Sequence, residues 1–183
     1  MDSDIKKIFE DDDILVISKP AGMIVNNADT SKNVETLQDW VEENYRFLGD
    51  SEFAKRSGIV HRLDKETSGL LIIAKNEESF INLQAQFKRG DVAKVYLALV
   101  HGKVTPESGE IFAPIGRLPW NRMRFGVYPQ GRESKTLYKV INAKSLKTDK
   151  SEEVLSLVEL YPKTGRTHQI KTPIVISVCL LNL

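Results

Sequence analysis

The sequence predicts an α+β protein with a largely antiparallel sheet. Short runs of aliphatic and β-branched residues outnumber segments with helical periodicity, and most neighbouring runs are joined by short polar turns. Two longer segments, 33–48 and 76–90, combine helical spacing of apolar residues with helix start and stop signals. The chain of 183 residues is long enough to bury the core of one domain.

The first predicted element is a hairpin. The runs Ile5–Phe9 and Ile14–Ser18 are β-like and lie on either side of the acidic turn 11–13. The segment Lys19–Gly22 should end the second strand, because proline has no amide hydrogen to donate and glycine tolerates positive φ.

Two helices are predicted in the first half of the chain. The first begins at the N-cap Asn33 and runs to about Leu48, with Gly49 as its stop signal. The second follows the N-cap Asn76, carries glutamates in its first turn, where the helix dipole favours them, and ends at Gly90. Both have an apolar stripe that predicts packing against the core.

The second half is predicted to be mainly strands. Val92–His101 is a strand, and Thr136–Ala143 and Val154–Tyr161 form a hairpin around a polar turn. Between them, prolines and a glycine interrupt Ile111–Trp120, which predicts an edge strand followed by a loop.

The stretch GIVHRLDKETSGLLIIAK, residues 58–75, carries the densest cluster of chemically useful side chains. Apolar runs flank its polar turn, so the cluster lies where one strand ends and the next begins, and a rigid sheet can fix such a loop. Asp64 follows His61 by three positions and Arg62 by two. Cationic neighbours would hold its carboxylate ionised, as a carboxylate nucleophile requires. A surface turn with ion pairs is the alternative interpretation.

A second cluster lies in PKTGRTHQIK, residues 162–171. Gly165 permits a tight turn, and Thr167 is predicted to cap a short helix that begins at His168. A helix N-terminus beside Arg166 would attract phosphate or a carboxylate. A capped helix without such a function is the alternative.

Charge is distributed unevenly although the formal net charge is only +1. Residues 1–13 hold six acidic and two basic side chains, whereas residues 117–147 hold eight basic and one acidic. Within 122–132, arginines alternate with Phe125 and Tyr128, which predicts an irregular arm that pairs with phosphates and stacks bases. The basic residues assigned to this arm are Arg122, Arg124, Arg132 and Lys135. An unevenly charged, merely solvated surface is the alternative.

Other classes of protein are not indicated. Cys179 is the single cysteine, which precludes an internal disulfide and suits a reducing compartment. A secretory signal and an apolar run of membrane-spanning length are both missing, so we expect a cytoplasmic protein without a membrane partner. The three histidines and one cysteine have no metal-ligand spacing, so no metal site is expected.

Together these stretches resemble RNA pseudouridine synthases of the RluA type, which isomerise uridine in ribosomal or transfer RNA. The resemblance covers roughly Phe9–Lys171 and lies in four segments: EDDDILVISKPAGMIV, HRLDKETSGLLIIAK, KVYLALVHG and TGRTHQIK. It implies a pseudouridine-synthase-like fold, with a bent, mixed but largely antiparallel sheet flanked by helices and loops. We accordingly expect one catalytic domain over residues 1–183, no N-terminal S4 module, RNA as partner, no cofactor, and a monomer.

The resemblance also implies residue roles. Asp64 corresponds to the catalytic carboxylate, and whether it attacks C1′, attacks C6 or acts as a base stays open. Tyr96 would stack on the target base, and Lys171 would pair with Asp64. Arg62 would fill the space left by the flipped uridine. The remaining residues of the implied substrate site are His61, Leu63, Thr67, Arg166, Thr167, His168 and Ile170, the last as an apolar wall opposite Tyr96.

The chain departs from the family pattern after about residue 171, where it continues as TPIVISVCLLNL. Pro173 would clip the short helix. Since the segment after it does not match the family sequence, a truncated or frame-shifted end is expected. Two alternatives therefore stay open beside the active isomerase. One is a catalytically impaired RNA-binding relic of the family. The other is a glycosidase, which would need a second carboxylate such as Glu66.

Overall fold

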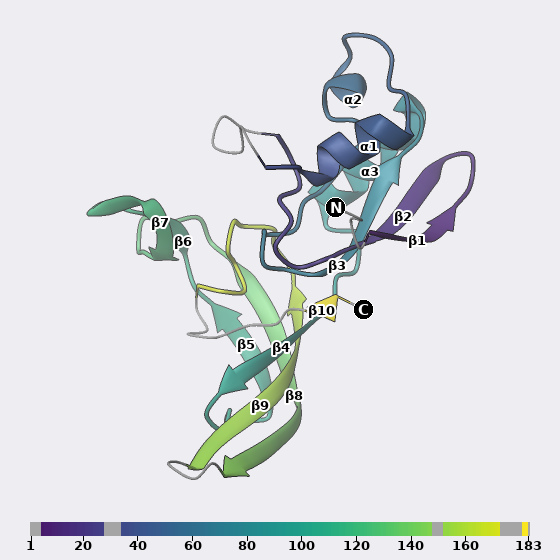
Figure 1. Cartoon of the computed structure of the whole chain (residues 1–183). Helices are drawn as coiled ribbons and strands as arrows, with labels where there is room; N and C mark the ends of the chain where they lie inside the picture. The colour runs from purple at the N-terminus through teal and green to yellow at the C-terminus, as the bar shows by residue number, and fades with distance from the viewer. Residues whose placement is uncertain (1–4, 28–33, 148–151, 173–180, 183) are drawn as a thin grey trace. The chain divides into compact units, whose positions relative to one another are not determined.

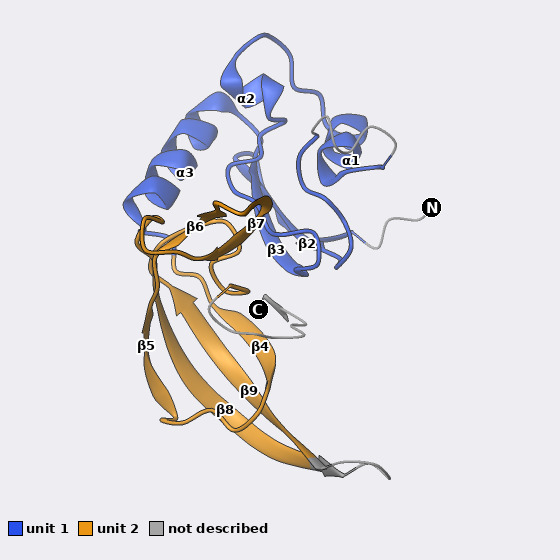
Figure 2. Ribbon diagram, turned by 90° about the vertical axis from the view of Figure 1, so that its left-hand side faces the viewer, with its two compact units in different colours: residues 1–92, 182 blue, residues 93–181, 183 orange. Residues whose placement is uncertain are grey.

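The computed structural model describes residues 5–27, 34–147, 152–172 and 181–182 (Figure 1). These residues belong to two compact units (Figure 2): residues 1–92 with Asn182 form the first, and residues 93–181 form the second. The expectation of one catalytic domain over residues 1–183 stays a prediction. The asparagine expected to cap the first helix, Asn33, and the segment from Pro173 to Leu180 lie outside the described residues.

The first unit contains a three-stranded antiparallel sheet in the order β1-β2-β3. Its strands are β1 (Lys6–Glu10), β2 (Ile14–Lys19) and β3 (Gly69–Ala74). Burial alternates along β2, so one face of the sheet carries the core. Three directly opposed pairs lie on this buried face: Leu15 with Ile73, Ile17 with Leu71, and Lys19 with Gly69.

The hairpin expected around the acidic turn is confirmed. Oδ1 of Asp11 accepts hydrogen bonds from the backbone amides of Asp13, at 2.9 Å, and Ile14, at 2.7 Å. This arrangement is a side-chain-stabilised turn, which explains why an acidic run can connect two strands. The polar turn within residues 58–75 was expected to join two strands. The run after the turn forms β3, whereas Ile59 in the run before it makes an isolated antiparallel bridge with Ile73 and belongs to no strand.

Three helices complete the first unit: α1 (Leu37–Asn44), α2 (Glu52–Lys55) and α3 (Glu77–Arg89). The prediction for α3 is confirmed in detail, since Asn76 is its N-cap and Gly90 ends it in the left-handed conformation with φ 82°. The expected bounds of the first helix were wrong. Thr36 starts α1 with a capping box to Asp39, and the helix ends at Asn44, before the exposed Leu48.

Apart from Asn182 of β10, the second unit contains a five-stranded sheet in the order β10-β4-β9-β8-β5 and a two-stranded sheet, β6-β7. The expected hairpin around the polar turn is confirmed as the long antiparallel pair β8-β9, whereas the strand expected over Val92–His101 begins at Tyr96. The strands are β4 (Tyr96–His101), β5 (Ser108–Phe112), β6 (Ile115–Leu118), β7 (Asn121–Val127), β8 (Lys135–Lys147), β9 (Glu152–Pro162) and β10 (Leu181–Asn182).

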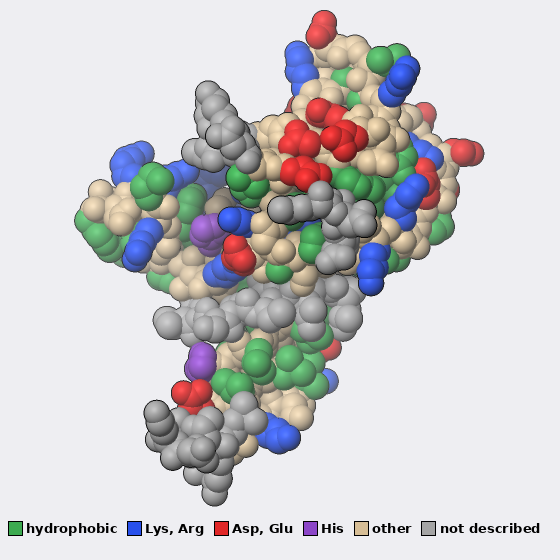
Figure 3. All heavy atoms as spheres, in the orientation of Figure 1, with side chains coloured by type: hydrophobic (Ala, Val, Ile, Leu, Met, Phe, Trp, Pro, Cys, Tyr) green, Lys and Arg blue, Asp and Glu red, His purple; other side chains and the backbone are tan. Residues whose placement is uncertain are grey.

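The arm was expected to be irregular, and this expectation was wrong for its first half. Strand β7 pairs antiparallel with β6, and the two-residue turn Pro119-Trp120 joins them. A Cβ on Gly126 would lie 2.5 Å from a methyl carbon of Leu118, so the glycine lets this leucine pack across the hairpin. Hydrophobic and basic side chains gather on this hairpin (Figure 3).

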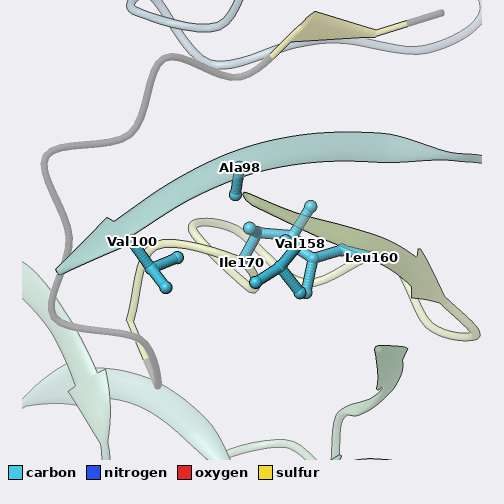
Figure 4. Close-up of a cluster of buried hydrophobic side chains, with 5 residues drawn as sticks. All are labelled: Ala98, Val100, Val158, Leu160 and Ile170. Carbon is cyan, nitrogen blue, oxygen red and sulfur yellow. The ribbon is translucent and has the colours of Figure 1, made fainter. Parts of the chain in front are cut away.

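The core of the second unit lies on β4 and β9. The buried side chains Ala98, Val100, Val158, Leu160 and Ile170 form one cluster (Figure 4). Tyr96 is half-buried against it. The fold class expected from the sequence, α+β with a largely antiparallel arrangement, is therefore confirmed. Among the described residues, no helix has the length and apolar character needed to cross a membrane.

Candidate functional site

Asp64 lies in the loop between Ile59 and β3. The backbone amide of Thr67 donates to the carbonyl oxygen of Asp64 at 3.0 Å and closes a turn. Leu63 and Thr67 are buried, whereas Arg62 is exposed and Asp64 is half-buried. The loop therefore alternates anchoring side chains with side chains that solvent can reach, as a binding or catalytic loop requires.

A buried lysine holds this loop. Lys19 has an exposed fraction of 0%, and its ammonium donates to the carbonyl oxygens of Pro20 at 2.7 Å, Met23 at 2.9 Å and Lys65 at 3.1 Å. The amide of Gly22 donates to the same Lys65 oxygen at 2.8 Å. Because Lys65 directly follows Asp64, these bonds fix the backbone beside the candidate carboxylate. Sequence reasoning treated Lys19 only as part of a strand end and missed this contact.

His61 anchors the beginning of the loop inside the first unit. Its Nε2 atom accepts a hydrogen bond from the amide of Ile72 at 3.0 Å, which requires a lone pair on that nitrogen. Its ring stacks on Phe87 of α3, with ring centroids 4.4 Å apart and an interplanar angle of 22°. This is a structural role for His61; its expected contact with substrate stays a prediction.

Gly58 brings the start of the loop against β3. Its φ is +71°, and a Cβ at this position would lie 2.1 Å from the carbonyl oxygen of Ala74. The amide of Ala74 donates to the carbonyl oxygen of Gly58 at 2.9 Å. Only glycine tolerates both this conformation and this approach, so Gly58 sets the path from which His61 and Asp64 follow.

In the second unit, Ile170 belongs to the buried core cluster and Tyr96 packs against the same cluster; their expected role as two walls of a substrate site stays a prediction. Lys171 follows Ile170 and is half-buried. Burial lowers the pKa of Lys94, which precedes Tyr96 by two positions. The second unit thus holds a basic and aromatic group of side chains that the expected site would draw on.

Gln169, between the two expected site residues His168 and Ile170, ties their segment to β8. Its side chain has an exposed fraction of 5%. The side-chain oxygen accepts from Oγ1 of Thr164 at 2.7 Å and from the amide of Arg166 at 2.9 Å. The side-chain nitrogen donates to Oγ1 of Thr136 at 3.0 Å and to the carbonyl oxygen of Lys135 at 3.1 Å. Gln169 lies within the segment TGRTHQIK, but nothing in that segment signals this structural role.

The short helix expected after Thr167 was wrong. Residues 167–172 form successive turns, in which the amide of Gln169 donates to the carbonyl oxygen of Arg166 at 3.1 Å. His168 has φ +56°, which breaks a right-handed helix at its expected first residue. The anion site expected at a helix N-terminus therefore lacks its basis, although Arg166, whose Nε donates to the carbonyl oxygen of Glu133 at 3.0 Å, still borders the segment.

The basic residues of the arm differ in their surroundings. Arg122 and Arg124 are exposed on β7. Arg132 is exposed as well, and its backbone forms an antiparallel bridge with Ile115. Lys135 lies at the start of β8 and pairs with Glu110, with Nζ and Oε2 2.9 Å apart. Lys135 is thus partly neutralised by its neighbour and lies outside the hairpin.

The structure brings the expected site residues together in two groups. His61, Arg62, Leu63, Asp64 and Thr67 share one loop of the first unit. In the second unit, the expected residues occupy β4 and the segment 162–172: Tyr96, Arg166, Thr167, His168, Ile170 and Lys171. The expected pair of Asp64 and Lys171 joins residues of different units and stays a prediction. Among the described residues, no three potential metal ligands of the His, Cys, Asp or Glu type gather.

Comparison with known proteins gave consistent results. The family model described as RNA pseudouridylate synthase matches residues 13–174. An uncharacterized RNA pseudouridine synthase of Aquifex aeolicus is 40% identical over 91% of this chain and 51% of its own length. Ribosomal large subunit pseudouridine synthase D of Nitrosomonas europaea is 38% identical over 91% of this chain and 45% of its own. The chain thus spans about half the length of these relatives.

Among solved structures, human RNA Pseudouridylate Synthase Domain Containing 1 is similar over 99% of this chain and 77% of that chain, with a TM-score of 0.73 and 25% identity. Human RNA Pseudouridylate Synthase Domain Containing 4 is similar over 95% of this chain and 66% of that chain, with a TM-score of 0.66 and 22% identity, a likeness of fold.

Proposed function

Because the chain belongs to the RNA pseudouridylate synthase family, we propose that it isomerises uridine to pseudouridine in ribosomal or transfer RNA, with Asp64 as the catalytic carboxylate. One observation carries the choice of residue. The carbonyl groups of Asp64 and of the following Lys65 are held by buried residues, Thr67 and Lys19 respectively, while the Asp64 side chain stays half-exposed. A carboxylate held in this way is positioned for chemistry on a bound nucleoside.

The reaction breaks the bond between N1 of the base and C1′ of the sugar, and forms a bond between C5 and C1′. The proton on C5 leaves, and N1 gains one. Asp64 would act by attacking C1′, by attacking C6 or as a base, and Tyr96 would stack on the base and accept the C5 proton. Substrate and product are isomers, so no redox cofactor or group carrier enters the proposal.

Access to the reacting atoms requires that the uridine leave its stack, since C1′ and C5 cannot be reached inside a duplex. In the proposal, the exposed Arg62 occupies the space that the uridine vacates. In the proposal, the exposed arginines Arg122, Arg124 and Arg132 contact phosphates of the RNA. The single cysteine suits a reducing compartment and supports the proposal that the reaction takes place in the cytoplasm.

The test compares wild type, Asp64→Asn and Glu66→Gln on transcribed ribosomal and transfer RNA. Pseudouridine is mapped by carbodiimide-dependent stops of reverse transcription. Glu66→Gln is the matched control, because it removes an exposed carboxylate two positions away in the same loop. We expect stops with wild type and Glu66→Gln, and none with Asp64→Asn.

Other outcomes overturn the proposal in distinct ways. RNA binding without stops in the wild type would indicate a binding protein that has lost turnover. Release of free uracil would indicate a glycosidase. Equal activity of wild type and Asp64→Asn would remove Asp64 from the chemistry.

A further inference from the structure

Trp120, in the turn of the β6-β7 hairpin, exposes its aromatic ring to solvent. Trp120 has an exposed fraction of 76%, and Met123, three residues further along β7, has one of 87%. A single exposed apolar side chain is ordinary, but two large ones three positions apart, on a hairpin that also exposes Arg122 and Arg124, form a chemically distinct surface. Figure 3 shows this combination of hydrophobic and basic side chains on the hairpin.

The other aromatic rings of the arm already have neighbours. Phe125 is half-buried, with the guanidinium of Arg117 4.8 Å from its ring centroid and the ring of His168 at 5.5 Å. Tyr128 is half-buried as well. The sequence predicted base stacking by Phe125 and Tyr128; the structure favours Trp120, a mostly exposed ring in the turn just before the arm.

Contacts within the hairpin hold the turn in shape. Leu118 packs over Gly126, and Nη1 of Arg117 donates to the carbonyl oxygen of Arg122 at 2.6 Å. Pro119 restricts φ directly before Trp120. The ring is therefore presented by a preorganised turn, which lowers the entropic cost of binding to it.

Charge identifies the kind of partner. Residues 117–132 contain four arginines and no acidic residue. A surface of arginines around one free aromatic ring complements a polyanion that offers flat apolar groups, which is the chemistry of single-stranded RNA. In a duplex the bases are stacked on one another, so their faces are not available to the ring.

We propose that Trp120 stacks on an unpaired base of the RNA, so that the arm selects single-stranded or loop RNA over duplex. This inference rests on the proposed function and specifies its substrate class. Stacking on an aromatic ring contributes enough that its loss lowers affinity about tenfold.

The two tryptophans allow a direct test. In Trp40→Phe, which alters α1 of the first unit, Trp120 is the remaining tryptophan and reports on its own surroundings. We expect a single-stranded RNA oligonucleotide to quench its fluorescence in a saturable way, and the matching duplex to quench it much less at equal salt. Trp120→Ala should bind the single strand about tenfold more weakly, whereas Trp120→Phe should largely retain affinity.

Phe112→Ala is the matched control, because Phe112 is a 63% exposed aromatic residue on β5 of the same unit. Unchanged affinity of Trp120→Ala, or equal quenching by duplex and single strand, would overturn the proposal. Fluorescence that changes with protein concentration in the absence of RNA, and does not respond to RNA, would assign the ring to a protein contact instead. Pseudouridine formation by the wild type is measured separately, so failure of stacking and failure of the isomerase are distinguished.

Discussion

The ammonium of Lys19 donates a hydrogen bond to the carbonyl oxygen of Lys65, 3.1 Å away, although 46 positions separate the two residues in sequence. Lys19 is fully buried at the end of β2, and its three bonds to carbonyl oxygens offset the loss of water around the ammonium. The position of the Asp64 loop therefore depends on a buried cation in a distant segment.

Replacing Lys19 by methionine keeps the length and apolar stem of the side chain but leaves three carbonyl oxygens without this donor. We expect Lys19→Met to lower the free energy of unfolding by about 3 kcal/mol. Urea unfolding, followed by the fluorescence of Trp40 in a Trp120→Phe background, measures the change. Lys65→Met is the control, because it changes an exposed side chain and keeps the backbone carbonyl that Lys19 contacts. We expect it to lower the free energy of unfolding by about 0.5 kcal/mol or less. Equal losses in the two variants would contradict the role given to Lys19.

Gly58→Ala tests the close approach between the loop and β3. The added methyl group would lie 2.1 Å from the carbonyl oxygen of Ala74, so the backbone must move and lose the hydrogen bond between these two residues. We expect a loss of about 3 kcal/mol or more in the free energy of unfolding.

The matched control for Gly58→Ala is Gly90→Ala, which places alanine at φ +82° with no other atom within 4 Å. Gly90→Ala introduces backbone strain without a collision, so we expect its free energy of unfolding to fall by about 1 kcal/mol. Thermal or urea unfolding of both variants separates strain from collision, and a similar loss in both would mean that the contact with Ala74 adds nothing.

Acidification should remove the contribution of the Glu10 carboxylate to the free energy of unfolding. A hydrogen bond from the ammonium of Lys75, followed by one from Lys7, lowers the pKa of Glu10 from 4.5 to about 2. Because the pKa is lower in the folded state, the contribution is complete above pH 4.5 and is lost as the pH falls toward 2. The difference in unfolding free energy between wild type and Glu10→Gln should therefore be constant above pH 5 and close to zero near pH 2. If the difference between wild type and Glu10→Gln grew on acidification, the pKa of Glu10 would be raised by folding and the prediction would be wrong.

Local signals accounted for the elements that the sequence predicted well. Both ends of α3, the N-cap Asn76 and the stop Gly90, were predicted correctly because capping depends on a few neighbouring residues. The turn at Asp11 is equally local. The Asp64 loop was located from its residues, but the contact of Lys19 with Lys65 depends on tertiary structure and has no signal within either segment.

The errors have physical reasons too. The mixture of arginines with Phe125 and Tyr128 suggested an irregular arm, yet Gly126 admits Leu118 within a regular hairpin. Thr167 and the residues after it have the composition of a capped helix start. The bonds of Gln169 to Thr164 and Thr136 hold that segment in turns instead. Tertiary contacts override local preference in both places.

The final prediction concerns the charges of the arm. If Arg122 and Arg124 each neutralise one phosphate, the double variant Arg122→Ala/Arg124→Ala should reduce the salt dependence of binding to single-stranded RNA. The slope of log affinity against log salt should fall by about 1.4, since each contact contributes about 0.7. Lys135→Ala should change it less, because Glu110 already pairs with Lys135 at 2.9 Å. Fluorescence titrations between about 50 and 200 mM salt measure these slopes. A larger effect of Lys135→Ala than of the double variant would place the phosphates on β8 and not on the hairpin.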